Sequence, residues 1–383
     1  MASKNNFRVL HAPTTVGGNP QGLSRALNKL GVNSNSVTLR QTYFEYQADH
    51  VLWLEKDSLL AKEIKRIFFL ISIVFKYDII HYNAGTTIAT PIYTVRLHND
   101  KFKDLLAFVY RSYRWIFQLI ELQILKYSKK ALFVTYQGND ARQGDYSLEN
   151  FEINIASQAG DECYPPGSDE MKRRMIRRLS KYCDAIYALN PDLLHVLPER
   201  SKFIPYSHIS LDEWTPCFTQ MENRKLRIGH APSHRKIKGT KIILDALDRL
   251  EKQGYEFEII LIEGMTNAEA KKVYETIDVL IDQIFAGWYG GLAVEAMALG
   301  KPVLVYIRDD DLKYIPIEMA NELPFIQINP DNIEEQLRRF LELSRKDLLS
   351  LARSSRAYVE KWHDPLKIAA KIKKDYETVL QRT

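Results

Sequence analysis

Two segments far apart in the chain begin in almost the same way, and this repetition restricts the folds that the chain can adopt. Residues 7–13 read Phe-Arg-Val-Leu-His-Ala-Pro, and residues 226–232 read Leu-Arg-Ile-Gly-His-Ala-Pro. Each is a short apolar run, as expected of a buried strand, and each leads into a loop and a helical pattern. We interpret the two segments as the first strands of two separate sheets. A chance similarity over so short a stretch is the alternative.

Strands and helices are predicted to alternate along both halves of the chain. The apolar runs that predict the other strands lie at 37–39, 78–82, 131–136, 185–189, 203–206, 257–262 and 277–284. Helical patterns separate them at 23–30, 56–76, 101–127, 169–181, 240–250, 268–276 and 292–299. This alternation favours parallel sheets covered by helices, so we predict an α/β protein with two Rossmann-like domains that face a shared cleft. The expected boundaries are 1–206 for the first domain, 207–224 for the linker and 225–364 for the second domain.

The composition is that of a water-soluble globular protein. The 383 residues suffice for two domains, and 45% of them are hydrophobic and 26% charged. The net charge of +5 is too small to indicate nucleic-acid binding. Cys163, Cys183 and Cys217 have no metal-binding spacing, which favours a reducing compartment without disulfides or zinc. Because residues 1–6 lack a signal-peptide core and the apolar run 67–75 is far shorter than a membrane span of ~20 residues, we expect a cytoplasmic protein.

The segment 277–303 has the pattern of an anion-binding turn between a strand and a helix. Gly287, Gly290 and Gly291 separate the predicted strand from the helix, and the unpaired N–H groups at a helix N-terminus attract phosphate. A tight turn that binds nothing is the alternative. Glu295 lies in the first turns of this helix, from which its carboxylate could reach back to a ligand hydroxyl.

Residues 287–303 resemble the donor-binding segment of retaining glycosyltransferases with the GT-B fold, family 4 type. In that family a Glu, seven residues and a second Glu precede Ala-Met-Ala, Gly and Pro-Val, and the run from Val294 to Val303 matches the second half. The resemblance implies that Glu295 holds the nucleotide ribose. The first Glu, which contacts the donor sugar in the family, falls on Gly287, so that role has no carrier here. The fold also implies that the last helix, 365–383, crosses back onto the first domain.

Lys238 matches a second family position, the Lys that binds the donor diphosphate. The family places an Arg five residues before it, and here that position is Ser233. The Ser233 hydroxyl could bond a phosphate oxygen, and His234 or Arg235 could replace the missing cation. A cation is needed because charge develops on the leaving nucleoside diphosphate in the transition state. The alternative is a solvated loop lysine.

Other segments are expected on the facing loops of the first domain. Gly17 and Gly18 would let the backbone approach the donor, unless they form an ordinary turn. Residues 138–142, Gly-Asn-Asp-Ala-Arg, resemble a His-Gly-x-Asp-x-Arg segment of bacterial surface-polysaccharide transferases, with Gln137 in place of the His. We expect acceptor contacts from them and from one strand-end residue, namely from Gly138, Asp140, Arg142 and Asn83. A local Asp–Arg pair that holds the loop is the alternative.

Three further groups have weaker interpretations. His11, His81 and His230 end predicted strands, where ligands bind in α/β sheets, but packed histidines are favoured for each. The acidic run 309–311 is interpreted as a solvated loop and not as a metal site. Basic residues and aromatic residues are interleaved along 101–130, and more basic residues lie in 172–181. They are Lys101, Lys103, Arg111, Arg114, Lys126, Lys129, Lys130, Phe102, Phe108, Tyr110, Tyr113, Trp115, Phe117, Lys172, Arg173, Arg174, Arg177, Arg178 and Lys181.

Such basic, aromatic surfaces attract anionic lipid, and the alternative is a packed aromatic face with a solvated basic face. An acceptor on a polyprenyl diphosphate would place the protein at the inner face of the cell membrane.

Together these patterns predict a retaining, metal-independent hexosyl or glycosyl transferase of polysaccharide biosynthesis, with a glycan or polyprenyl-linked acceptor and no nucleic-acid partner. A UDP- or GDP-linked sugar would be its substrate, and no cofactor is expected. The catalytic candidates are Lys238, Glu295 and Asp140. The donor-binding candidates are Gly17, Gly18, Ser233, Arg235, Lys238, Gly287, Tyr289, Gly290, Gly291, Leu292, Ala293 and Glu295. The alternatives are a sugar-nucleotide 2-epimerase of the same fold and a catalytically inactive sugar-nucleotide-binding relative.

Overall fold

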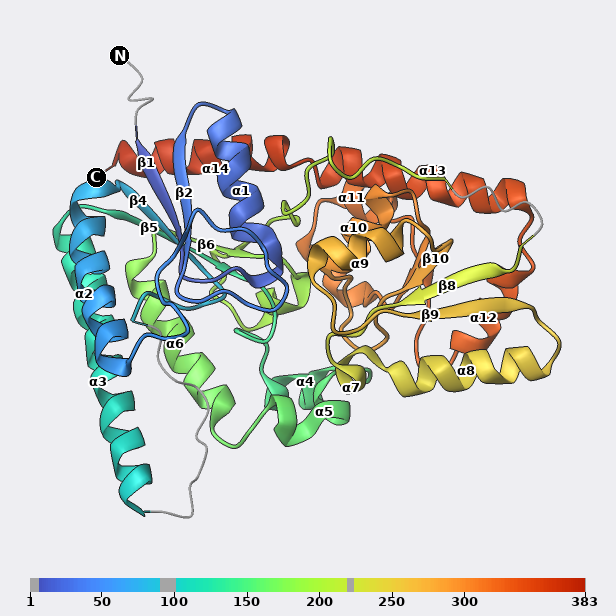
Figure 1. The fold of residues 1–383 in the computed structure, drawn as a ribbon, viewed down its shortest axis with the longest axis horizontal. Coiled ribbons are helices and arrows are strands. Elements are labelled where there is room, and N and C mark those ends of the chain that lie inside the picture. The colour runs from blue at the N-terminus through green and yellow to red at the C-terminus, as the bar shows by residue number, and fades with distance from the viewer. Residues whose placement is uncertain (1–6, 90–100, 219–223, 383) are drawn as a thin grey trace.

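The structure, a computed structural model, describes residues 7–89, 101–218 and 224–382 and contains two parallel sheets (Figure 1). The first sheet has the order β3-β2-β1-β4-β5-β6-β7. Its strands are β1 (Arg8–Ala12), β2 (Asn33–Thr38), β3 (His50–Val51), β4 (Ile79–Asn83), β5 (Ala131–Tyr136), β6 (Ala185–Ala188) and β7 (Lys202–Phe203). Its covering helices are α1 (Asn19–Lys29), α2 (Leu59–Lys76), α3 (Lys101–Tyr127) and α6 (Ser168–Tyr182), and α4 (Gly144–Asn150) and α5 (Ala156–Cys163) lie between β5 and α6.

The second sheet has the order β12-β11-β10-β8-β9. Its strands are β8 (Leu226–His230), β9 (Phe257–Leu261), β10 (Val279–Ile281), β11 (Val303–Val305) and β12 (Ile326–Gln327). The helices of this half are α7 (Arg235–Lys238), α8 (Thr240–Lys252), α9 (Asn267–Tyr274), α10 (Gly291–Ala298), α11 (Ile317–Asn321), α12 (Ile333–Leu341) and α13 (Arg345–Trp362).

The repeated segments are β1 and β8, and each lies inside its own sheet with parallel neighbours on both sides. The prediction of two parallel α/β sheets is therefore confirmed. The division into domains at 207–224 stays a prediction, although Ser207, His208 and Ile209 are buried and are not an exposed connection.

Several element boundaries differ from the sequence prediction because side-chain hydrogen bonds shape them. Strand β2 starts at Asn33, in a polar stretch that has no strand pattern, because Asn28 on α1 bonds both the amide and the carbonyl of Ser34. Strand β10 is limited to residues 279–281, since the apolar residues after it turn into the loop that precedes α10.

The last helix, α14 (Pro365–Leu380), packs against α1 of the first half, as the fold predicts (Figure 1). Its Tyr376 hydroxyl lies 2.6 Å from His81 Nδ1, and its Asp375 accepts a hydrogen bond of 2.6 Å from the Tyr187 hydroxyl. The chain thus passes between the halves twice, after β7 and between α13 and α14. His363 joins the two crossings, because its Nδ1 lies 3.0 Å from the Tyr206 carbonyl oxygen.

Candidate functional site

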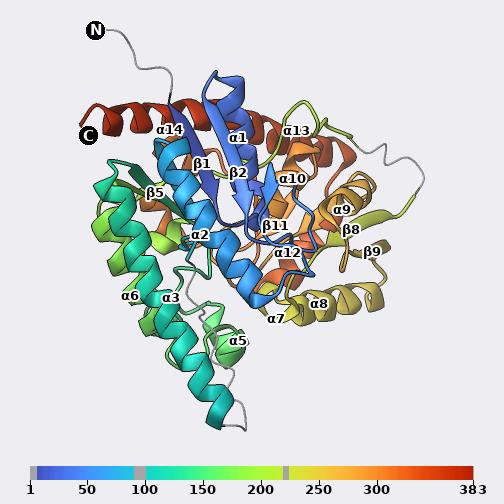
Figure 2. The same cartoon turned by 60° about the vertical axis from the view of Figure 1, so that its left-hand side comes forward.

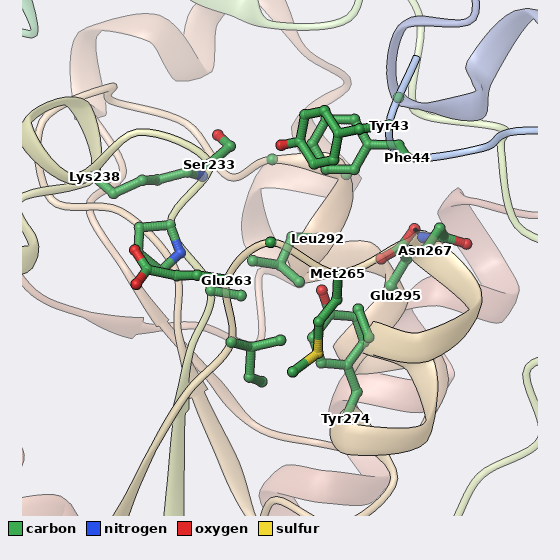
Figure 3. Close-up of a pocket in the computed structure, with 18 of the residues that line it drawn as sticks. Tyr43, Phe44, Ser233, Lys238, Glu263, Met265, Asn267, Tyr274, Leu292 and Glu295 are labelled. Atoms are coloured by element: carbon green, nitrogen blue, oxygen red, sulfur yellow. Dashed lines mark hydrogen bonds between the residues drawn. The ribbon is translucent and has the colours of Figure 1, made fainter. Parts of the chain in front are cut away.

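A cleft of about 240 Å³ lies between the two halves, at the carboxyl ends of β8 and β9 and the N-terminus of α10 (Figure 3). The first half contributes the loop after β2, which reaches over the cleft. This loop is attached to the second half, because the Asn267 amide donates to the Phe44 carbonyl oxygen at 3.1 Å. Seven predicted donor-binding residues line the cleft, namely Gly17, Ser233, Lys238, Gly290, Gly291, Leu292 and Glu295.

Glu295 is held at one end of the cleft by three neighbours that all approach one carboxylate oxygen. Its Oε1 accepts from Asn267 Nδ2 at 2.9 Å and from the Tyr46 hydroxyl at 3.5 Å. His208 Nε2 lies 3.4 Å from the same oxygen, without the geometry of a hydrogen bond. Burial and then the charge of Glu295 raise the pKa of Tyr46, so its hydroxyl stays a donor. Within the described residues Oε2 has no hydrogen-bond partner, and it can accept from a ligand in the cleft.

Lys238 lies at the opposite end and is neither solvated nor a free cation. Its Nζ donates to Asp282 Oδ1 at 2.7 Å and to Gln283 Oε1 at 2.9 Å, which uses two of its three N–H donors. Gly239, which follows it, has φ +78° and no room for a Cβ against Ile284, so the chain must turn sharply at this point. The buried Lys238–Asp282 ion pair is therefore part of the framework of the second half.

The turn before α10 offers fewer free amides than the sequence suggests. Asp282 Oδ2 accepts from the Gly290 amide at 2.9 Å, and the Ala293 amide bonds back to the Gly290 carbonyl oxygen at 3.1 Å. Among the described residues this leaves the amides of Gly291 and Leu292 without a protein acceptor. Of the donor-binding candidates 290–293, only these two therefore offer a free amide, and both lie at the positive end of the α10 dipole.

Arg308, from the loop after β11, fills the space beside Gly287. Gly287 has φ +75°, and a Cβ on it would lie 2.6 Å from Arg308 Nη1. The guanidinium donates to Asp311 Oδ2 and to the Ile153 carbonyl oxygen, both at 2.9 Å, and stacks 3.7 Å from the Phe151 ring centroid. A cation from another segment thus lies beside the position at which the resembling family has an acidic side chain.

Asp311 itself corrects the interpretation of 309–311 as a solvated loop. Asp309 and Asp310 are exposed, but Asp311 is fully buried, and His195 Nε2 lies 2.8 Å from its Oδ1. Arg308 and Asp311 therefore connect the second half to residues of the first.

Introducing the glutamate of the resembling family at this position, Gly287→Glu, is expected to destabilise the protein. A left-handed backbone costs about 1–2 kcal/mol for a residue with a Cβ, and displacement of Arg308 adds roughly 1–3 kcal/mol. Gly254→Glu is the matched control, because Gly254 also has positive φ, at +95°, but nothing lies within 4 Å of its added Cβ. Chemical denaturation should show the larger loss for Gly287→Glu, and equal losses would contradict the role given to Arg308.

The other predicted donor residues lie outside the cleft lining. Tyr289 is fully buried, and its hydroxyl lies 2.9 Å from His363 Nε2 and 3.2 Å from the Tyr358 hydroxyl, so the expected donor contact is corrected to a core contact. Ala293 is also buried completely. Arg235 forms an exposed ion pair with Glu263 at 2.6 Å. Gly18 packs against the Tyr46 ring, which leaves no room for a Cβ.

The predicted acceptor residues are engaged in local contacts of the first half. Asp140 accepts from the Gln137 amide at 3.0 Å and from the Gly138 amide at 2.6 Å, and its burial raises its pKa. Arg142 pairs with Asp192 at 2.6 Å instead of with Asp140, so the proposed local Asp–Arg pair is corrected. Asn83 Nδ2 donates to the carbonyl oxygen of His81 at 3.1 Å. These groups shape the loops, and none of them lines the cleft beside Glu295.

Two of the three predicted histidines are satisfied inside the protein. His81 lies between Tyr376 and Thr135, and His230 lies between the Ile281 carbonyl oxygen and Thr240. Both ring nitrogens of His11 lack a hydrogen-bond partner among the described residues, and burial lowers its pKa to about 3.

The sequence analysis missed several residues of the cleft. Tyr43, Phe44 and Tyr46 come from the loop after β2, and Asn267 and Tyr274 come from α9. The rings of Tyr43 and Phe44 lie 3.9 Å apart by their centroids and form an aromatic wall opposite Leu292 (Figure 3). Three aromatic residues within four positions of a loop were the available signal, since such side chains are rarely left exposed without a ligand or partner.

Within the ranges that the structure describes, no cluster of three His, Cys, Asp or Glu side chains is arranged to hold a metal ion.

The sequence matches no protein-family model and shows no significant similarity to a curated protein. The fold, however, is similar to that of solved structures over nearly the whole chain. Sucrose-phosphate synthase from Thermosynechococcus elongatus has a TM-score of 0.62 at 14% identity, covering 99% of this chain and 100% of its own. The catalytic domain of starch synthase IV from Arabidopsis thaliana, bound to ADP and acarbose, has a TM-score of 0.56 at 12% identity, with 98% and 100% covered.

A protein described as a UDP-N-acetylglucosamine 2-epimerase from Listeria monocytogenes has a TM-score of 0.51 at 14% identity, with 100% of this chain and 98% of that chain covered. At these identities the similarity shows the fold alone, which is the GT-B fold of two facing Rossmann-like sheets.

Proposed function

We propose that this protein is a glycosyltransferase that moves a sugar from a nucleoside-diphosphate donor to a glycan or lipid-linked acceptor, with retention of anomeric configuration. The observation that carries the proposal is the polarity of the cleft. An unshared carboxylate oxygen of Glu295 lies at one end, and the N-terminus of α10 and Lys238 lie toward the other. A nucleoside diphosphate has the complementary order of groups, because its ribose hydroxyls donate hydrogen bonds and its phosphates accept them.

The proposed roles follow from the free donors and acceptors. Glu295 Oε2 accepts from the ribose hydroxyls, while Asn267 and Tyr46 hold Oε1 and fix the carboxylate orientation. The amides of Gly291 and Leu292 donate to the diphosphate, and the third N–H of Lys238 is available to a phosphate oxygen. These groups stabilise the charge that develops on the diphosphate as the bond to the anomeric carbon breaks.

No side-chain nucleophile is required by this proposal. The acceptor hydroxyl attacks the anomeric carbon on the face from which the diphosphate leaves, and the leaving phosphate oxygen takes the hydroxyl proton. The products are the glycosylated acceptor and the free nucleoside diphosphate. Asp140 is not needed as a catalytic group, because its carboxylate already accepts two backbone amides of its own loop.

A second candidate is a sugar-nucleotide-binding protein without transfer activity. Two observations favour it: Asp282 offsets the charge of Lys238, and Arg308 takes the place of the family's first Glu. A 2-epimerase is a third candidate, since an epimerase shares the fold.

One series of experiments separates the three candidates. A thermal-shift screen over UDP-, GDP- and ADP-linked sugars should identify the donor, because a ligand that binds only the folded state raises the melting temperature. The donor is then incubated alone. Conversion to its 2-epimer indicates an epimerase. Slow hydrolysis of the donor alone, with faster release of nucleoside diphosphate and formation of a glycosylated product once a glycan acceptor is added, indicates a transferase. A donor that binds but is neither hydrolysed nor epimerised indicates the inactive binding protein, and no melting shift with any donor contradicts all three.

Glu295→Gln is expected to weaken donor binding about 30- to 150-fold. A hydrogen bond to a charged acceptor contributes about 2–3 kcal/mol to the binding free energy, and the substitution removes that charge. The amide keeps the shape of the side chain and can still accept from Asn267. Glu258→Gln is the control, since Glu258 is half-exposed on β9 and pairs with Arg227 outside the cleft. Isothermal titration with the identified donor measures the change, and unchanged affinity of Glu295→Gln would remove the ribose assignment.

A further inference from the structure

Helices α2 and α3 turn apolar side chains to the outside of the molecule. They lie side by side on one face of the first sheet in both views (Figures 1 and 2). Phe68 and Phe75 on α2 are 68% and 75% exposed, and Phe108 on α3 is 60% exposed. We call the exposed apolar residues of the two helices the α2–α3 face. They are Leu59, Leu60, Ile64, Ile67, Phe68, Ile71, Phe75, Leu105, Leu106, Phe108, Val109, Tyr113, Ile116, Ile120, Ile124 and Tyr127.

The inward sides of the same helices are unusually polar. Glu121 is fully buried and accepts from the Tyr82 hydroxyl at 2.7 Å and from two backbone amides, those of Ile88 and Ala89. Buried Gln118 on α3 donates to Thr87 at 3.3 Å. The inward sides also bury the apolar residues Leu70, Ile73, Leu122 and Leu125 in the core, so both helices carry apolar side chains on the inside and on the outside, unlike an ordinary surface helix.

A second polar cluster joins α2 to α3. Buried Arg66 forms an ion pair with Glu63 at 2.9 Å, and Glu63 accepts from the hydroxyls of Tyr110 at 2.7 Å and Tyr113 at 3.2 Å. Arg114 donates to the Ala89 carbonyl oxygen and to the Tyr110 hydroxyl. The interpretation of α3 as a packed aromatic face with a solvated basic face is confirmed for Trp115 and Phe117, which pack against the core, and is corrected for Arg114, which is buried, and for Phe108, which is exposed. The side chains of Lys101, Phe102 and Lys103 lie outside the described residues.

The charges around the α2–α3 face are cationic. Every acidic side chain described on the two helices, Glu63 and Glu121, is turned inward. Lys76 and Lys129 are exposed where the helices end. Helix α6 packs next to α3, because Arg178 donates to the Trp115 carbonyl oxygen at 2.7 Å. Along α6 the basic residues outnumber the acidic ones, six to two, although Glu170 pairs with Arg173, Arg174 and Arg177, and Lys181 is exposed.

We propose that the α2–α3 face binds the surface of a membrane that contains anionic lipids. Within the described residues no helix is long and apolar enough to cross a bilayer, so the helices would lie in the plane of the headgroups. Their apolar side chains would enter the acyl boundary, and the exposed lysines would contact lipid phosphates. A second copy of the chain fits less well, because a two-fold interface would bring the same cations of both copies together. The proposal does not depend on sugar transfer.

Vesicle sedimentation at low salt tests the proposal with the full chain. The wild-type protein should sediment with vesicles of equimolar phosphatidylcholine and phosphatidylglycerol, and less with phosphatidylcholine alone. Phe68→Ser/Phe108→Ser should weaken partitioning roughly tenfold or more, because each buried phenylalanine side chain contributes strongly to transfer from water. Both side chains are mostly exposed, so the variant should fold, which its melting temperature checks.

The matched control is Ile317→Ser/Leu349→Ser, which removes exposed apolar side chains from α11 and α13 of the other half. It should sediment like the wild type. Three results would overturn the proposal: absence of wild-type sedimentation with anionic vesicles, equal sedimentation of the Phe68/Phe108 variant, and a dimer in light scattering that this variant dissociates. No nucleotide sugar is present, so the outcome is independent of whether the cleft binds a donor.

Discussion

Lys238→Ala is expected to lower the free energy of unfolding by about 3–5 kcal/mol, the usual cost when one partner of a buried ion pair is removed. Lys238 Nζ lies 2.7 Å from Asp282, whose side chain is buried completely, and that carboxylate also accepts from the Gly290 amide. Without the lysine, a carboxylate would stay buried with one backbone donor. Chemical denaturation measures the loss, and wild-type stability of Lys238→Ala would contradict the framework role of the pair.

The double variant Lys238→Met/Asp282→Asn separates this structural role from the proposed function. It removes both charges together, and the side-chain oxygen that remains at position 282 can still accept from the Gly290 amide, so most of the lost stability should return. Donor binding and transfer should stay strongly reduced, since the proposed phosphate contact of Lys238 is not restored. A double variant with normal transfer would show that the lysine serves stability alone.

A steep loss of stability below pH 6.5 is the second large expected effect. Burial lowers the pKa of His11 and His363 to about 3 and of His230 to about 4, and it lowers the pKa of His81 well below its usual value of 6.5. The unfolded chain therefore binds protons on these four residues from pH 6.5 downward, while the folded protein does not. The difference destabilises the folded protein by about 1.4 kcal/mol per pH unit for each histidine until its folded pKa is reached.

Thermal melts between pH 7.5 and pH 5 check this expectation. Four histidines together correspond to roughly 5–6 kcal/mol per pH unit, which is comparable to the whole stability of many domains. His363→Gln should reduce the slope of the free energy of unfolding against pH by about a quarter. His50→Gln, at an exposed position on β3, should leave this slope unchanged. A melting temperature that stays constant from pH 7 to pH 5.5 would contradict the buried neutral state of these side chains.

The sequence predicted those parts of the molecule that depend on local pattern. The repeated β1 and β8 segments and the alternation of strands and helices led to two parallel sheets, because apolar strands and glycine-rich turns leave a clear periodic signal. The location of Glu295 near a helix N-terminus also followed from its place after Gly290 and Gly291. Each of these inferences requires only residues that are close in the chain.

The contacts that define the site could not be predicted in this way. Lys238 and Asp282 are 44 positions apart, and their pairing depends on how β8 and β10 lie beside each other. Arg308 reaches Gly287 only because the loop after β11 folds over the preceding turn. Helix α3 is a second example, because an amphipathic pattern does not show which face of a helix is buried. Here Glu121 is buried, since it accepts hydrogen bonds from Tyr82 and two backbone amides.

The link between the two crossings of the chain has a consequence for how a ligand would enter the cleft. Because His363 ties the segment after β7 to the junction of α13 and α14, the two connections act as one hinge between the halves. The opposite edges are fastened by separable contacts, among them Asp311 with His195 and the Asn267 amide with the Phe44 carbonyl oxygen. Opening the cleft would break these edge contacts while leaving the hinge and both sheets unchanged. The halves would therefore rotate about one hinge, with the Glu295 carboxylate close to the closing edge.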